Sequence, residues 1–157
     1  MNNQYLIIAE GAHANSKNWR NKKTTWEQFA LKISQTTRTA ESLEEYKKMS
    51  NGEKARIKDV GGYVGGHVKG GRRLLSNIAF RTLLTLDIDY AKADFWESFC
   101  FTFEQTAAVL HATHTHTPDN PRFRLIVPLS RQCSVDEYEA VGRKVAGILG
   151  IKQFDPS

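Results

Sequence analysis

The second half of the chain alternates between hydrophobic and polar positions with the period of two that is typical of β-strands. The alternating segments are 81–89 (RTLLTLDID), 106–116 (TAAVLHATHTH) and 122–130 (RFRLIVPLS). Successive side chains of a strand point to opposite faces of its sheet, so each segment is expected to place one apolar face on a core and one polar face outward. A shorter apolar run at 4–9 (QYLIIA) predicts an opening strand.

Two helices are predicted in the first third of the chain, each from a capping box. In this motif a Ser or Thr begins the helix and an acid or amide three residues later bonds back to it. The matching pairs are Thr24 with Glu27, and Ser42 with Glu45. They predict helices over 24–33 and 42–49, and the segment 51–57 (NGEKARI) is expected to end the helical region.

Two more helices are predicted in the second half. The segment 94–103 (DFWESFCFTF) is expected to begin at Asp94, and the amphipathic segment 134–150 to begin at Ser134 and end at Gly150. The turn at 117–121 (TPDNP) joins two of the predicted strands as a hairpin.

This order of elements predicts an α+β fold. We expect a palm-like or RRM-like mixed or antiparallel sheet with helices packed on one face, preceded by a mostly helical N-terminal segment. With 157 residues the chain has the length of one domain, which we divide into a strand with helices at 1–57 and a palm-like core at 58–157. The chain has no apolar run long enough to span a membrane and no signal-peptide pattern, so we expect a cytoplasmic protein without a membrane partner.

The net charge of +5 is unevenly distributed. Residues 54–73 contain a single acid, Asp59, and six cations: Lys54, Arg56, Lys58, Lys69, Arg72 and Arg73. Three glycine pairs interrupt this segment, which is therefore expected to be a flexible basic loop. A polyanion is a plausible partner, and a solvated loop without a ligand is the alternative.

Candidate chemistry lies on the polar faces of the predicted strands. Asp87 and Asp89 share the face opposite Leu84, Leu86 and Ile88, and their backbones are roughly 6.6 Å apart, close enough for both carboxylates to reach one cation or a pair of cations. The alternative is that the two acids only end the strand and cap the following turn.

The same alternation assigns faces to the histidines and arginines. His114 and His116 share one face with Ala112, while Arg122 and Arg124 share a face on the next strand. If these polar faces coincide, the sheet gathers two acids, two histidines and two arginines. Such a set suits a triphosphate bound with Mg²⁺ or Mn²⁺, because carboxylates ligate hard cations and guanidinium groups hold phosphate oxygens. A surface strand with adventitious histidines and a solvated arginine edge are the alternatives.

Together these motifs resemble the archaeo-eukaryotic primase superfamily, specifically the primase-polymerase domain at the N-terminus of phage and genomic-island replication proteins of the primase-helicase type. The resemblance rests on LLTLDID at 83–89, THTHTPDNPRFRLIVPLSR at 113–131 and the segment from 137 to the end. It implies that Asp87, Asp89 and Asp155 bind the divalent metals and that His116 contacts the phosphates of the incoming nucleotide. The motif histidine of the family follows a small residue by two positions, which fits His114 after Ala112 better than His116, so the resemblance leaves both histidines as candidates.

The resemblance further implies an enzyme that performs two-metal nucleotidyl transfer, with a single-stranded DNA template and nucleoside triphosphates as partners. Arg122 and Arg124 are then candidates for phosphate neutralisation. The nucleic-acid candidates are the basic residues Lys58, Lys69, Arg72 and Arg73. Relatives continue into a helicase or other replication part, so the chain is expected to be a domain of a longer protein that acts with such a part in cis or in trans.

Two other functions compete with this one. His114 and His116 resemble the metal-binding pair of a rolling-circle nicking endonuclease, with Tyr138 as the nucleophile, although that function leaves Asp87 and Asp89 without a role. A catalytically inactive DNA-binding or protein-interaction module of primase fold is the non-enzymatic alternative.

Overall fold

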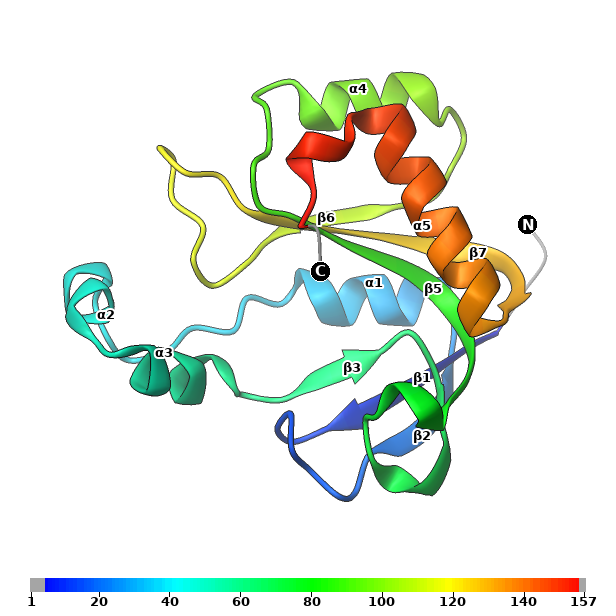
Figure 1. The fold of residues 1–157 in the computed structure, drawn as a ribbon, viewed down its shortest axis with the longest axis horizontal. Coiled ribbons are helices and arrows are strands. Elements are labelled where there is room, and N and C mark those ends of the chain that lie inside the picture. The colour runs from blue at the N-terminus through cyan, green and yellow to red at the C-terminus, as the bar shows by residue number, and fades with distance from the viewer. Residues whose placement is uncertain (1–4, 156–157) are drawn as a thin grey trace.

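Two antiparallel sheets and five α-helices make up residues 5–155, the part of the chain that the computed structural model describes (Figure 1). The larger sheet has four strands in the order β4-β5-β7-β6. Its strands are β4 (Gly66–Val68), β5 (Ile78–Ile88), β7 (Phe123–Cys133) and β6 (Val109–Ala112). The smaller sheet has the order β2-β1-β3, with β2 (Arg20–Thr24), β1 (Leu6–Gly11) and β3 (Gly62–Val64).

Helices α4 (Phe95–Thr102) and α5 (Val135–Leu149) cover one face of the larger sheet (Figure 1). Alternate residues of β5 and β7 point into this interface, as predicted. The buried residues of this core are Leu84, Ile88, Phe95, Phe99, Leu125, Val127, Ala146, Leu149 and Phe154. Helix α5 begins at a capping box of Ser134 and Glu137 and ends at Gly150, whose φ is +97°, so both predicted ends are confirmed.

The opposite face of the larger sheet is covered by α1 (Trp26–Ser34) and by the smaller sheet. Leu83 and Ile126 pack there against Phe29 of α1 and against Leu6 and Ile8 of β1. The predicted α+β class is confirmed, and the β6–β7 hairpin forms as expected. The polar face of β5 and β7 is therefore a partly covered surface between the two sheets.

The N-terminal third differs from its prediction in three elements. Helix α1 is capped by Thr25 with Gln28, one residue later than predicted, because Thr24 is the buried last residue of β2. Helix α2 (Leu43–Lys48) has the predicted box of Ser42 and Glu45. The segment at 51–57 does not end the helical region: Ser50 and Glu53 form another capping box, which begins α3 (Asn51–Lys58). Strand β2 was not predicted, since its sequence RNKKT has no apolar alternation.

The glycine-rich basic segment is ordered structure, not a flexible loop. It forms β3, β4 and the short 3₁₀ turns η1 (Lys69–Gly71) and η2 (Leu75–Asn77). Strand β4 lies so close to β5 that a Cβ atom at Gly66 would collide with the backbone oxygen of Phe80. Gly66 is therefore needed because it lets the backbones of β4 and β5 approach closely, and not because it makes the chain flexible.

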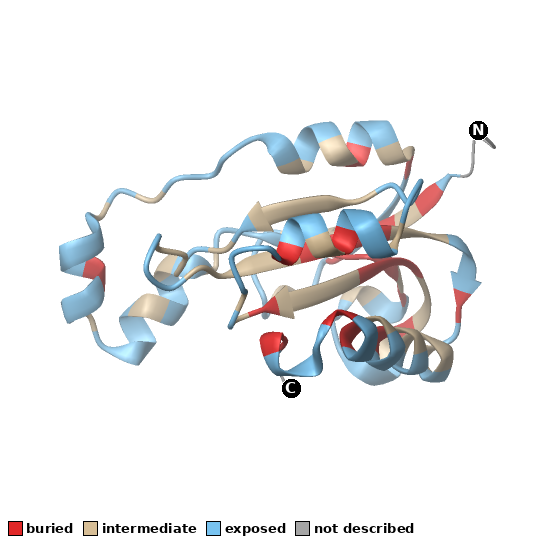
Figure 2. Ribbon diagram, turned by 90° about the horizontal axis from the view of Figure 1, so that it is seen from above, coloured by how far each residue is buried: buried red, intermediate tan, exposed pale blue. Residues whose placement is uncertain are grey.

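Helices α2 and α3 form an arm that extends from the two sheets (Figures 1 and 2). Most residues of the arm are exposed, and α3 has no buried residue. Tyr46 of α2 is the exception, at 7% exposed, because its ring packs on His114 of the β6–β7 connection at 4.7 Å between ring centres. Across residues 5–155 no helix combines the length and the apolar character that a membrane span requires.

Candidate functional site

A pair of oppositely charged residues lies on the polar face of the two central strands. Asp87 of β5 stands directly opposite Arg124 of β7 in the strand register. The guanidinium donates from Nε to Oδ1 at 2.6 Å and from Nη2 to Oδ2 at 2.9 Å. This two-bond geometry is the strongest form of a carboxylate–arginine interaction. The hydrogen bonds to Asp87 raise the pKa of Arg124, although burial opposes the shift.

A second such pair extends this pattern past the end of β5. Arg122 donates from Nη1 to the Asp89 carboxylate at 3.1 Å. The predicted sharing of a face by Asp87 and Asp89, and by Arg122 and Arg124, agrees with these contacts. We call these four residues, Asp87, Asp89, Arg122 and Arg124, the acid–arginine site. The register explains its formation, because antiparallel pairing places Asp87 and Arg124 at the same level of the sheet.

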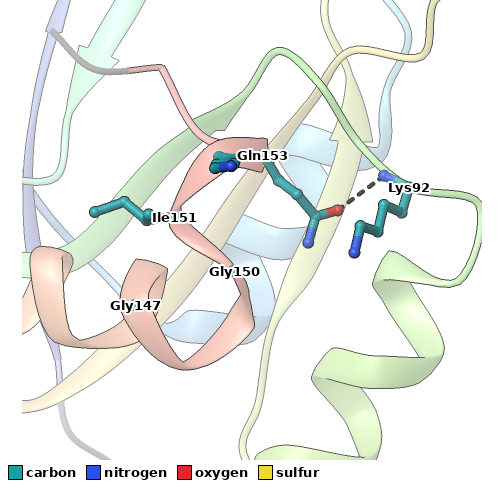
Figure 3. Close-up of a pocket in the computed structure, with 6 residues that line it drawn as sticks. Lys92, Gly147, Gly150, Ile151 and Gln153 are labelled. Atoms are coloured by element: carbon teal, nitrogen blue, oxygen red, sulfur yellow. Dashed lines mark hydrogen bonds between the residues drawn. The ribbon is translucent and has the colours of Figure 1, made fainter.

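The C-terminal segment is bonded to the same end of β5. Backbone N–H groups of Asp155 and Tyr90 pair with the carbonyl oxygens of Asp87 and Gln153, at 3.0 and 3.1 Å. Gln153, in the 3₁₀ turn η3 (Ile151–Gln153), accepts a hydrogen bond from the backbone of Lys92 at 2.8 Å, as Figure 3 shows. The predicted third acid, Asp155, is therefore held beside Asp87 by its backbone. The depression of Figure 3 lies at this junction and is lined by Lys92, Gly147, Gly150, Ile151, Lys152 and Gln153.

The histidines separate, and here the predicted strand faces are wrong. Strand β6 ends at Ala112, so His114 and His116 lie in the connection to β7 and not on a strand. His116 Nδ1 accepts a hydrogen bond from the backbone of Arg122 at 3.2 Å, which places this ring next to the acid–arginine site. His114 Nε2 instead contacts Thr39 Oγ1 at 3.0 Å and the Glu41 carboxylate at 3.3 Å, at the base of the helical arm.

The histidine that the register brings to the site is His111, which the alternation predicted for segment 106–116 places on the face opposite His114 and His116. His111 of β6 is opposite Arg124, and Arg124 is opposite Asp87, so the three residues form one row across three strands. His111 Nδ1 lies 2.9 Å from the oxygen of Ala112, and its Nε2 is buried without a hydrogen-bond partner among the described residues. The sequence did contain a signal for His111: it lies well before the end of the predicted strand, whereas His114 and His116 lie close to that end.

Tyr63 reaches the site from the smaller sheet. Burial raises the pKa of its phenol to about 12, while the Arg124 guanidinium opposes that shift. The hydroxyl is buried and makes no hydrogen bond of good geometry within residues 5–155, although Thr85 lies beside it. Tyr63 was not a candidate, because its segment was expected to be a loop.

Around the acid–arginine site, three buried polar atoms have no hydrogen-bond partner among the described residues. They are Tyr63 Oη, His111 Nε2 and Arg122 Nε. Buried polar groups of folded proteins nearly always have partners, so such a cluster indicates a place for water or a polar ligand. Two of the three are hydrogen-bond donors and suit the oxygens of an anionic ligand.

Of the side chains at this site, only the acidic ones suit a divalent cation as ligands. Carboxylate oxygens are the ligands that Mg²⁺ and Mn²⁺ favour, and Asp87, Asp89 and Asp155 supply them. In residues 5–155 no group of three or more acidic, histidine or cysteine side chains is close enough to share an ion. Asp87 and Asp89 each have an arginine partner, so a bound cation would share or replace those contacts.

The predicted nucleic-acid residues fall into two places. Lys69, Arg72 and Arg73 lie together on and after η1, where all three are exposed. Lys58 is at the end of α3 beside Asp59, whose carboxylate accepts a hydrogen bond from the backbone of Ala14 at 2.6 Å. Lys58 therefore lies on a different element from the other three, at the end of the helical arm.

The tyrosine of the competing nicking hypothesis has structural partners. Tyr138 of α5 donates its hydroxyl to the backbone oxygen of Thr85 at 3.1 Å and accepts from the backbone N–H of the same residue at 3.2 Å. His114 and His116 contact different elements, as described above. The three residues of that hypothesis therefore have separate surroundings.

The fold and the site define an α+β domain with paired acids and arginines at one end of a four-stranded antiparallel sheet. A family model, described as the VapE N-terminal domain, matches residues 1–157. The chain belongs to this family, a domain of phage and genomic-island replication proteins. Neither a curated protein nor a solved structure matches the chain significantly.

Proposed function

We propose that this domain performs metal-dependent nucleotidyl transfer, as a primase-polymerase, within a phage or mobile-element replication protein. The observation that carries the proposal is the gathering of Asp87, Asp89, Arg122, Arg124 and the backbone of Asp155 at one end of β5 and β7. These are the residues that the primase resemblance nominates, and they come from segments up to 68 positions apart in the sequence. Family membership supports a replication role.

In this proposal the acids and the arginines have different ligands. Asp87, Asp89 and Asp155 would hold Mg²⁺ or Mn²⁺, which when bound supplies positive charge at the triphosphate and lowers the pKa of the attacking hydroxyl. Arg122 and Arg124 would exchange their carboxylate partners for phosphate oxygens. Guanidinium groups suit this exchange, because their forked N–H donors bind carboxylate and phosphate in the same two-bond geometry.

The neighbouring polar groups would complete the nucleotide site. Tyr63 keeps its proton at neutral pH, because its pKa is about 12, and is therefore a hydrogen-bond donor. His116 is held beside Arg122 by the backbone hydrogen bond to Nδ1, which leaves Nε2 for a phosphate oxygen. His111 Nε2 and Arg122 Nε are the other groups without a protein partner in residues 5–155.

The test is nucleotide incorporation on single-stranded DNA with Mn²⁺ or Mg²⁺, with and without a primer. The variant D87A/D89A is expected to lose at least about 100-fold in rate, since each acid would act on the reacting phosphates. The control D94A/D136A removes two exposed acids of α4 and α5 and should incorporate nucleotide like the wild type. Equal rates for wild type and D87A/D89A would contradict the proposal.

A second candidate function is a DNA-binding module that keeps the fold without turnover. The arginine partners favour it, because each of the two carboxylates is already paired with a guanidinium of the same chain. This function predicts no incorporation by the folded wild type. It also predicts that D87A/D89A binds DNA as well as the wild type or better, because the substitution removes negative charge.

A further inference from the structure

Seven exposed cations lie on two segments that carry no acid. The chain has no Asp or Glu at 11–26 or at 60–86. The cations of these stretches that we group together are Lys17, Arg20, Lys22, Lys23, Lys69, Arg72 and Arg73, all of them exposed, and we call this set the basic ridge. Of these seven, only Lys69, Arg72 and Arg73 are nucleic-acid candidates from the sequence.

Backbone and amide hydrogen bonds join the two segments. The backbone N–H of Trp19 donates to the oxygen of Gly71 at 2.9 Å. The side-chain amide of Asn21 makes two bonds to Val68: its Nδ2 donates to the carbonyl at 2.9 Å, and its Oδ1 accepts from the N–H at 2.9 Å. Residues about 47 positions apart are thus fixed side by side, and the cations on both are carried on ordered backbone.

The conformation of the turn at η1 allows the close contact between Gly71 and the segment of Lys17 and Trp19. Gly71 has a φ of +68°, and a Cβ atom there would lie 2.8 Å from the backbone oxygen of Lys17. Trp19 is 4% exposed, and the Arg73 guanidinium lies 5.5 Å from the centre of its ring. This stacking holds Arg73 over the junction of the two segments.

The charges of the basic ridge are not neutralised within the protein. None of its seven cations makes a salt bridge in residues 5–155, whereas Arg122 and Arg124 both do. Holding unpaired like charges together costs electrostatic energy that an external polyanion would recover.

Protection of a sheet edge accounts for part of the ridge. Strand β2 is an edge strand, and lysines on such strands discourage pairing with other chains. That role does not extend to Lys69, Arg72 and Arg73, which follow β4 and lie outside the smaller sheet. A single explanation for both groups is a shared anionic ligand.

We propose that the basic ridge binds the phosphate backbone of DNA, at a surface distinct from the acid–arginine site. The replication context of the family favours DNA over other polyanions. This binding does not require nucleotidyl transfer, so either proposal can fail without the other. Leu74 and Leu75, which follow Arg73, are 53% and 66% exposed, and for this reason anionic membranes belong in the test.

The test measures binding of the full chain to a fluorescein-labelled single-stranded oligonucleotide and to its duplex, by fluorescence anisotropy over a series of salt concentrations. The variant K69Q/R72Q/R73Q is expected to bind about 100-fold more weakly near 0.1 M salt. The slope of log affinity against log salt should fall by about 2 for the single strand and about 3 for the duplex, because each lost phosphate contact removes ~0.7 to ~0.9.

Two further variants separate the location of the charge from its amount. R143Q/K144Q/K152Q removes three exposed cations of α5 and η3 and should lose less than about 5-fold in affinity. K69R/R72K/R73K keeps the charge and should keep the salt slope. Urea denaturation establishes that each variant is folded.

Equal losses for K69Q/R72Q/R73Q and the α5 control would overturn the proposal, because binding would then follow net charge alone. Failure of the wild type to bind either oligonucleotide would also overturn it. So would tighter binding to vesicles of anionic lipid than to DNA. The D94A/D136A variant, assayed in parallel, should keep DNA binding whether or not the wild type incorporates nucleotide.

Discussion

The acid–arginine site and the basic ridge are both made from segments distant in sequence, but they treat charge in opposite ways. At the acid–arginine site each carboxylate lies next to a guanidinium because of the strand register, and the two groups of each pair bind each other. At the basic ridge neutral groups make the contacts, chiefly Asn21 with Val68 and Trp19 with Gly71, and the cations remain without acidic partners in the described residues.

Because of this difference, substitutions at the two sites are expected to affect folding stability and ligand binding to different extents. A ligand at the acid–arginine site must compete with existing pairs, so substitutions there are expected to change folding stability as well as function. A ligand at the basic ridge meets cations that have no acidic partner in the described residues, although Arg73 stacks on Trp19 and Lys23 lies over the ring of Tyr5. Substitutions of the ridge cations are therefore expected to change DNA affinity far more than stability, while substitutions of its neutral contacts change stability.

The largest effect on stability is expected from Gly71→Ala, which breaks a neutral contact of the ridge. The left-handed φ and the collision with Lys17 together should lower the free energy of unfolding by about 3 kcal/mol. Gly70→Ala is the matched control, because its φ is +64° but no atom lies within 4 Å of the added Cβ, and it should cost about 1 kcal/mol. Urea denaturation measures both. Equal losses would show that Gly71 is not pressed against Lys17.

A smaller effect is expected from Arg124→Met, which breaks a charge pair. It should lower the free energy of unfolding by about 2 kcal/mol, since Asp87 would keep its charge without its two hydrogen bonds. The pair is 36% and 38% exposed, which keeps the cost below that of a fully buried pair.

Lys22→Met of the basic ridge is the comparison for Arg124→Met and should change stability by less than about 0.5 kcal/mol. Denaturation of D87N and of D87N/R124M completes a double-mutant cycle with Arg124→Met. A coupling free energy of about 1 kcal/mol between Asp87 and Arg124 is expected. A coupling of zero would mean that the two charges do not stabilise each other in solution.

The smallest effect should appear only at alkaline pH, at Tyr63. Its pKa is about 12 in the folded protein and about 10 when unfolded, so the folded state holds the phenol proton more tightly. This contribution is complete below pH 10 and is lost as the pH rises through 12, so stability falls in that window. By pH 11 the wild type should have lost about 1 kcal/mol relative to Y63F, after the difference at pH 8 is subtracted. Parallel stability curves for the two proteins would place the hydroxyl in water.

Much of the fold could be predicted from local patterns. The period of two in β5 and β7 predicted the strands and the face that each residue takes, including Asp87 with Asp89 and Arg122 with Arg124. A capping box predicted the start of α2, and Ser134 and Gly150 predicted the two ends of α5. These signals succeed because a capping bond or an apolar stripe is formed by residues a few positions apart.

The failures occurred where the deciding contact is distant. Strand β2 and strand β4 have too little apolar alternation to be recognised, and each is made a strand by its partner, β1 or β5. His111 was assigned away from the acids because the predicted strand was extended past Ala112, where β6 ends. Ser50 and Glu53 differ from these cases, since their capping box is a local pattern that the sequence itself displays.

By itself, then, the sequence determined the α+β class, the central strands, most helix starts and the residues that carry charge, because all of these depend on short-range periodicity and composition. Only the tertiary structure decided which charges meet. Antiparallel register closed Asp87 onto Arg124 and brought His111 into the same row. Packing of β4 beside β2 set seven unpaired cations on two adjoining segments, because those segments meet through backbone and amide contacts that no local pattern encodes.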